Sequence, residues 1–301
     1  MSASAELLKQ ASHERKKARR ENLTLLVRRP GFIIGSIIVS FWIFCAVFRG
    51  VMVRYDPFKY TTKPTLPPSS EHWFGTDKIG RDIYSRVIAG ARDVLIVAPA
   101  AAILGVFLGS LLGLIMGYYR GTVDLVLSRF VEALMSLPVA LIGLLILTLA
   151  DTSNFLKLIT FDSRTLLVIY VVAFLFMPIV ARTVRAAVIS ERDLDYVVSA
   201  RLRGESNRFI MFREILPNIV PPIIVELTVR IGYAIFTVAT LGFLGVGQQP
   251  PSPEWGRAIS DGRDLLQADK WWLVTFPSLA IASLVISVNL IADAIQAVYE
   301  R

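Results

Sequence analysis

Cysteine and histidine are nearly absent from this chain of 301 residues, which has one cysteine, Cys45, and two histidines, His13 and His72. A single cysteine excludes an internal disulfide. The sequence has no cysteine pair, no H-E-x-x-H pattern and no carboxylate cluster within an apolar run, and these are the usual sources of metal ligands. We therefore expect no metal centre, and Cys45 is read as a small apolar residue.

Motifs for nucleotide binding and for acyl transfer are missing as well. No G-x-x-x-x-G-K-[ST] loop is present, so the chain binds no nucleotide by that route. No serine stands in the context of a hydrolase nucleophile. The sequence predicts a protein that is not an enzyme and holds no cofactor.

Long apolar runs dominate what is present, with 54% hydrophobic and 19% charged residues and a mean hydropathy of +0.58. This composition excludes an ordinary soluble domain, and continuous rather than alternating runs exclude a β-barrel. A transmembrane helix needs about 17–25 such residues. We predict an all-α, multi-pass membrane protein with six transmembrane helices, at 31–48, 94–119, 133–150, 165–181, 216–245 and 271–292. The third of these is expected to bend at Pro138.

The net charge of +8 is explained by membrane orientation and not by nucleic acid, because the basic residues gather in segments that adjoin the spans. The positive-inside rule places the basic tail 1–30 and the basic segment 190–217 in the cytoplasm, and six spans then place both termini there. The basic residues of segment 54–92 oppose the rule, although acidic residues partly balance them.

This orientation divides the chain into four parts. A basic cytoplasmic tail (1–30) is followed by the first transmembrane helix (31–53). An external segment (54–92) carries an interfacial helix, expected at 81–91. A five-helix core (93–298) follows, with an external polar loop at 151–164. Its last external loop, from residue 247, is too proline-rich for regular structure and has Trp255 at interface depth.

Glycines recur every fourth residue in the second predicted span. This spacing places them on one helix face, where a neighbouring helix can approach closely. We predict a packing surface formed by Gly105, Gly109, Gly113 and Gly117.

Segment 190–217 has an apolar stripe at helical spacing, formed by Leu194, Val197, Val198, Leu202, Phe209, Ile210, Phe212 and Ile215. Gly204 supplies a turn between two short helices, and Leu216 with Pro217 is expected to end the second. Water-exposed loops between spans are usually short and polar, so this segment suggests a docking surface for a cytoplasmic partner. The alternative is a helix lying flat on anionic lipid.

Glu226 and Arg230 stand four residues apart in the fifth predicted span, which favours an intrahelical ion pair. The pair is either structural or lines the path of a solute. Charged residues within spans also occur in secondary transporters and channels, the rival class. That class does not account for a long docking segment.

The docking segment resembles the coupling loop of ABC importer permeases, whose pattern is E-A-A-x-x-x-G followed after nine residues by I-x-L-P. Gly204, Leu216 and Pro217 match this pattern, and Ala200 matches its second alanine. Val198 stands in place of the glutamate, Ser199 in place of the first alanine and Glu214 in place of the isoleucine. The resemblance assigns ATPase coupling to Asp195, Val198, Ser199, Ala200, Gly204, Leu216 and Pro217.

Further motifs resemble the C-type permease subunit of the dipeptide and oligopeptide (peptide/nickel) transport family. They are F-G-T-D at 74–77 with G-R-D at 80–82, G-Y-Y-R-G-T-V-D at 117–124 and F-L-G-V-G-Q-Q-P-P at 243–251. Together they span nearly the whole chain. Members of this family commonly carry an acidic residue at the position of Val238, which is expected to lie on the pathway. Val238 departs from the family in this respect.

The resemblance implies the type I ABC importer permease fold in the inner membrane of a prokaryote. It also implies a heterodimer with a homologous second permease, two cytoplasmic ATPase subunits, an external solute-binding protein, and contact with membrane lipid. Peptides are the expected cargo. Nickel complexes, glutathione, opines and oligosaccharides are the alternatives.

Overall fold

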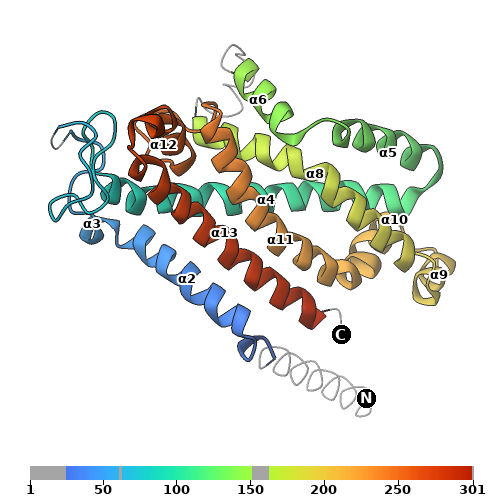
Figure 1. The fold of residues 1–301 in the computed structure, drawn as a ribbon. Helices are drawn as coiled ribbons and strands as arrows, with labels where there is room; N and C mark the ends of the chain where they lie inside the picture. The colour runs from blue at the N-terminus through green and yellow to red at the C-terminus, as the bar shows by residue number, and fades with distance from the viewer. Residues whose placement is uncertain (1–24, 61–62, 151–162, 300–301) are drawn as a thin grey trace.

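The computed structural model describes residues 25–60, 63–150 and 163–299, and these residues are helical throughout their regular parts. The only strand-like feature among them is a single bridge between Thr76 and Asp82. Long helices run between two ends of the molecule (Figure 1). One end holds the segment before Ile83 together with helix α12, and the other holds helices α9 and α10.

Five helices in the described part of the chain are long and apolar enough to cross a membrane. The predicted runs 31–48, 94–119, 165–181, 216–245 and 271–292 fall on them, which confirms these five spans. The helices are α2 (Pro30–Val47), α4 (Ile83–Tyr119), α8 (Arg164–Glu191), α11 (Leu216–Phe243) and α13 (Trp272–Tyr299).

The run 133–150 is predicted as one span bent by Pro138, and the structure confirms the bend but breaks the helix there. Helix α5 (Gly121–Met135) ends before Pro138 and helix α6 (Val139–Ala150) begins after it, and the two are bent by 90°. Proline cannot donate a backbone hydrogen bond and disfavours helical backbone in the residue before it. The pair makes a sixth span only if both helices count as one. All but the last two residues of the predicted loop 151–164 lie outside the described residues.

The helix predicted separately at 81–91 is the first part of α4, which runs unbroken from Ile83 to Tyr119. Asp82 caps it, because its Oδ2 accepts a hydrogen bond from the Ser85 amide at 2.8 Å. Ile83, Val87 and Ile88 are at most 4% exposed. The apolar spacing therefore reflects burial within the protein and not contact with the membrane surface.

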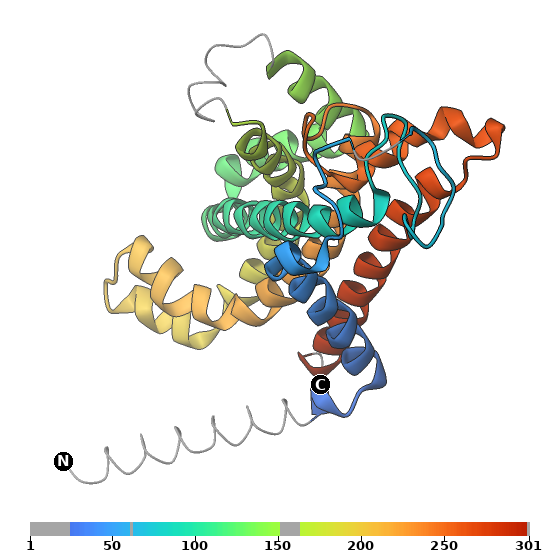
Figure 2. The ribbon, with the colours of Figure 1, turned by 90° about the vertical axis from the view of Figure 1, so that its left-hand side faces the viewer.

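Trp255, predicted at the membrane interface, is completely buried. It begins helix α12 (Trp255–Gly262), which is followed by a 3-10 helix, η2 (Arg263–Ala268). The Trp255 indole N–H donates to the Val87 carbonyl at 2.9 Å. A Cβ at Gly90 would come within 2.7 Å of the same indole nitrogen. The residues after the prolines thus fold back and pack against the beginning of α4 (Figure 2).

Helices α4 and α8 pack along their length through the glycine face. An added Cβ would meet α8 at 2.9 Å from Gly105, 2.6 Å from Gly109, 2.5 Å from Gly113 and 2.6 Å from Gly117. Real Cβ atoms do not approach so closely, so each position requires hydrogen in place of a side chain. The face allows the two helix backbones to come together.

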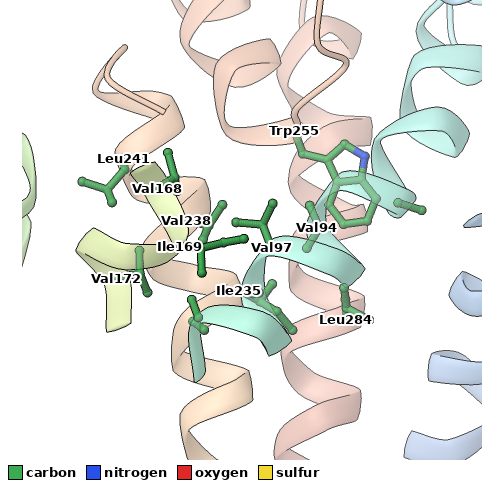
Figure 3. Close-up of a cluster of buried hydrophobic side chains, with 14 of the residues drawn as sticks. Val94, Val97, Val168, Ile169, Val172, Ile235, Val238, Leu241, Trp255 and Leu284 are labelled. Carbon is green, nitrogen blue, oxygen red and sulfur yellow. The ribbon is translucent and has the colours of Figure 1, made fainter. Parts of the chain in front are cut away.

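The main core lies where four long helices and α12 meet. Helices α4, α8, α11 and α13 each contribute branched aliphatic side chains, and α12 contributes an indole ring (Figure 3). The residues labelled in Figure 3 are Val94, Val97, Val168, Ile169, Val172, Ile235, Val238, Leu241, Trp255 and Leu284, and α2 and α6 add further residues to this core. Val238 belongs to this core and is 2% exposed, so it does not line an open pathway in this structure.

Candidate functional site

The 190–217 segment forms the helix-turn-helix that its sequence predicts. Helix α9 (Asp195–Leu202) is followed by a turn at Gly204, by the short helix α10 (Asn207–Phe209) and by a π-helical stretch, η1 (Ile210–Ile215). Gly204 has a φ of +80°, and an added Cβ there would meet nothing within 4 Å. Backbone conformation alone therefore demands glycine at this turn.

The predicted apolar stripe is divided between two faces. The inner face is buried against the ends of α4 and α8, and this contact fixes the segment to the transmembrane helices. Its residues are Val197, Ala200, Ile210, Met211 and Ile215, which share a cluster with Leu114, Tyr118, Val184 and Val188.

The outer face of the segment remains apolar and exposed. Leu202 is 84% exposed, and Leu194, Val198 and Phe212 are between 40% and 47% exposed. Asp195 and Ser199 are also exposed, whereas Ala200 is buried. Val198 therefore occupies an outward position where the resembling family has a glutamate, and it presents an apolar group there.

Polar contacts that the sequence did not predict hold the segment to the end of α4. The Arg192 guanidinium donates to the carbonyls of Gly117 and Tyr118, and the Tyr118 hydroxyl donates to Asn207 Oδ1 at 2.8 Å. Arg120 Nη2 lies 2.6 Å from Asp193 Oδ2. The motif at 117–124 carried the only signal for these contacts, because it places Tyr118 and Arg120 directly at the helix end.

Tyr196 links the end of α8 to the beginning of α11. Its hydroxyl donates to Glu191 Oε1 at 2.6 Å and accepts a hydrogen bond from Asn218 Nδ2 at 3.0 Å. Burial, together with the neighbouring Glu191, raises the pKa of Tyr196 to about 12. The phenol therefore remains protonated at physiological pH and keeps donating to Glu191.

The expectation that Leu216 and Pro217 end the second helix is wrong. Pro217 lies in the first turn of α11, which continues the helical path from η1. A proline is tolerated in a first turn because its missing N–H is not needed there. Glu214, at the position of the family isoleucine, lies 3.5 Å from Arg203 across the turn. The segment therefore continues directly into a transmembrane helix.

Glu226 and Arg230 form an ion pair on α11, as the spacing predicts. Arg230 Nε lies 2.9 Å from Glu226 Oε2, and both side chains are less than 15% exposed. The Thr183 hydroxyl, from α8, donates to Glu226 Oε1 at 2.9 Å. The Arg230 guanidinium carbon lies 5.3 Å from the centre of the Tyr233 ring. The sequence did not predict the contact with Thr183, because this residue lies just after the predicted span 165–181.

The ion pair lies beside a face of α11 that no other described element covers. Tyr233 is 54% exposed and Phe236 is 60% exposed. One turn beyond, Thr240 adds a hydroxyl that donates to the Phe236 carbonyl at 2.9 Å. The exposed part of this face is aromatic, and the charges beside it are paired and mostly buried.

A buried carboxyl group supports the opposite end of α11. Glu254 is 2% exposed, and its Oε2 accepts a hydrogen bond from the Gln248 amide at 3.0 Å. Burial raises its pKa to about 8. Arg164 Nε donates to the Gly247 carbonyl at 3.1 Å, so the turn after α11 is held from two sides. Neither Glu254 nor Arg164 belongs to a motif that the sequence predicts to be functional.

Comparisons with known proteins agree on one family. Residues 109–301 match the family described as the binding-protein-dependent transport system inner membrane component. A dipeptide transport system permease protein of Alkalihalophilus pseudofirmus is 36% identical over 92% of this chain and 88% of its own. A glutathione transport system permease protein of Pectobacterium atrosepticum is 35% identical over 88% and 83%. A probable D,D-dipeptide transport system permease protein of Escherichia coli is 31% identical over 90% and 88%.

These matches cover more than half of the chain and extend through the 190–217 segment, the ion pair on α11 and the turn at Gly247. They agree with the five to six membrane-crossing helices of the described residues. The chain is a multi-pass inner-membrane protein and belongs to the family of binding-protein-dependent transport system inner membrane components, the non-catalytic permease subunits of ABC importers.

Proposed function

We propose that this permease imports peptides and that its 190–217 segment is the contact through which partner ATPases drive it. In this proposal a homologous second permease completes the translocation path, and two cytoplasmic ATPase subunits bind ATP and Mg and hydrolyse the nucleotide. An external solute-binding protein delivers the cargo. Both termini and the 190–217 segment lie in the cytoplasm, and this chain itself holds no cofactor.

The exposed apolar face of α9 carries the coupling part of the proposal. Leu202 projects into solvent at the end of a helix whose other face is fixed to α4 and α8. An exposed apolar patch on a rigid support is typical of a protein interface. Arg201, Arg203 and Arg208 are exposed around it, which favours a partner groove with an acidic rim.

Direct helical continuity from η1 to α11 supports transmission of movement. A partner that displaces α9 also displaces α11, because no flexible loop separates η1 from the transmembrane helix. Closure of the ATPases would then rock the spans in an alternating-access cycle. The glycine face between α4 and α8 would keep these two helices together during that movement.

Two observations support peptides as the cargo: the names of the relatives and the ion pair on α11. The relatives described above serve dipeptides, D,D-dipeptides and glutathione, and the last remains the alternative cargo that these matches support. We propose that Glu226 and Arg230 line the path, where a carboxylate and a guanidinium complement the two charged termini of a peptide. The competing explanation is a pair that only stabilises the helix.

Two substitutions at the turn test the coupling role in the assembled complex. Gly204→Val should strain the left-handed backbone by about 1–3 kcal/mol and misdirect α9. Gly204→Asn is the matched control, since asparagine tolerates this conformation. Valine should leave basal ATP hydrolysis intact and abolish its stimulation by loaded binding protein, whereas asparagine should preserve both.

The surface itself is tested by Leu202→Asp, with Leu202→Met as control. Because Leu202 is 84% exposed, aspartate costs little folding free energy but places a charge in the proposed interface. We expect aspartate to lower recovery of the ATPases with the permease and methionine to leave it unchanged. Full recovery and stimulation with both Gly204→Val and Leu202→Asp would remove the coupling role from this segment.

A further inference from the structure

A groove between α2, α3 (Arg49–Met52) and α4 is not explained by coupling or by the solute path. Its volume is about 570 Å³, within the range of roughly 300–1,000 Å³ of small-molecule sites. Five of its lining residues are apolar and two are arginines, and no acidic residue lines it. The residues are Ile43, Ala46, Val47, Arg49, Arg92, Leu95 and Ile96.

The two arginines stand at the same boundary of the membrane. Arg49 directly follows the uncharged run 31–48, and Arg92 is followed by Asp93 and then by the uncharged run 94–119. Helix α3 and the first half of α4 lie at the same end of the molecule (Figure 1). Both guanidinium groups are thus at the depth of lipid headgroups, while the groove walls continue toward the hydrocarbon.

Nothing in the described chain neutralises these two charges. Arg92 is exposed and Arg49 is partly exposed, and neither forms an ion pair or a side-chain hydrogen bond with any of the described residues. The adjacent Asp93 forms no ion pair with Arg92. Its Oδ2 instead accepts a hydrogen bond from the Ser252 hydroxyl at 2.8 Å.

We propose that the groove binds an anionic phospholipid, with the headgroup phosphate between Arg49 and Arg92 and an acyl chain along Ile43, Val47 and Leu95. Guanidinium groups bind phosphate with charge-assisted hydrogen bonds, and basic pockets between transmembrane helices at the cytoplasmic side of other membrane proteins bind anionic headgroups in the same way. The apolar walls select a lipid over a free anion. Bound lipid would fasten α2, which has few buried residues, to α4.

The test compares lipids on the purified permease, alone and within the assembled complex. Native mass spectrometry would measure the affinity for phosphatidylglycerol against phosphatidylcholine, with inorganic phosphate as a further arm. Each basic residue near an anionic surface strengthens binding about fivefold, so Arg49→Gln with Arg92→Gln should weaken phosphatidylglycerol binding about 30-fold. Arg49→Lys with Arg92→Lys should keep most of the preference and shows that the site folds.

A second double variant controls for net charge. Lys59→Gln with Arg129→Gln removes two positive charges from exposed side chains outside the groove and should leave the preference unchanged. The proposal is overturned if the glutamine variant of the groove still prefers phosphatidylglycerol or if inorganic phosphate competes as well as lipid does. A preference that disappears in the assembled complex would assign the groove to the second permease and also overturn it.

Discussion

Gly109→Ala tests how closely α4 and α8 are packed. An alanine Cβ at this position would lie 2.6 Å from Val180 Cβ and 2.8 Å from the Met177 carbonyl oxygen. The carbonyl belongs to the backbone of α8, so relief requires the two helices to separate. Overpacking of this kind costs about 1–3 kcal/mol. It opposes the gain of up to about 1 kcal/mol that alanine brings to a helix in place of glycine.

Gly50→Ala is the matched control, because a Cβ at Gly50 in α3 would meet nothing within 4 Å. This substitution shows the helix-propensity effect without the clash. We expect Gly109→Ala to have the lower free energy of unfolding, by about 1–3 kcal/mol, when mixed micelles are titrated with a denaturing detergent. If both variants were equally stable, the close approach of α4 and α8 would not contribute to stability.

Three further predictions concern charge and orientation. Because the pKa of Glu254 is raised to about 8, the folded state holds a proton that the unfolded state releases, so the free energy of unfolding should fall between about pH 4.5 and 8. Glu254→Gln should remove this slope, and an unchanged slope would point to another group. In a cysteine-free background, Arg208→Cys should resist an impermeant thiol reagent in intact cells and Lys59→Cys should react; the reverse would refute the orientation. Glu226→Gln with Arg230→Gln should assemble normally but change the relative uptake of different peptides, and an unchanged profile would make the pair structural.

Local rules predicted the elements well where one cause dominated. Continuous apolar runs gave five spans, the spacing of Glu226 and Arg230 gave their ion pair, and Gly204 gave its turn. The errors arose where tertiary contacts determine the course of a helix or what covers it. Pro138 predicts a bend but not its angle of 90°, and an amphipathic pattern at 81–91 does not distinguish lipid from the protein segment that covers it.

Long-range contacts were beyond the sequence for the same reason. Thr183 and Glu226 are 43 positions apart, and Trp255 reaches Val87 across 168 positions. No local pattern marks Glu254 as buried, since a carboxylate in a proline-rich loop is normally solvated. Only the packed structure shows which of these polar groups meet.

The π-helical stretch Ile210–Ile215 determines the angular setting of α9 around the helix axis. A π turn hydrogen-bonds to the fifth residue back, as the Leu216 amide does to the Met211 carbonyl, and so accommodates one residue more than an α turn. One residue corresponds to about 100° of rotation in an α-helix. If this wide turn tightened to α-helix, or if one of its residues were deleted, Leu202 would swing about a quarter turn away from its present direction. The one additional residue of this stretch therefore sets the direction in which the docking surface points relative to α11.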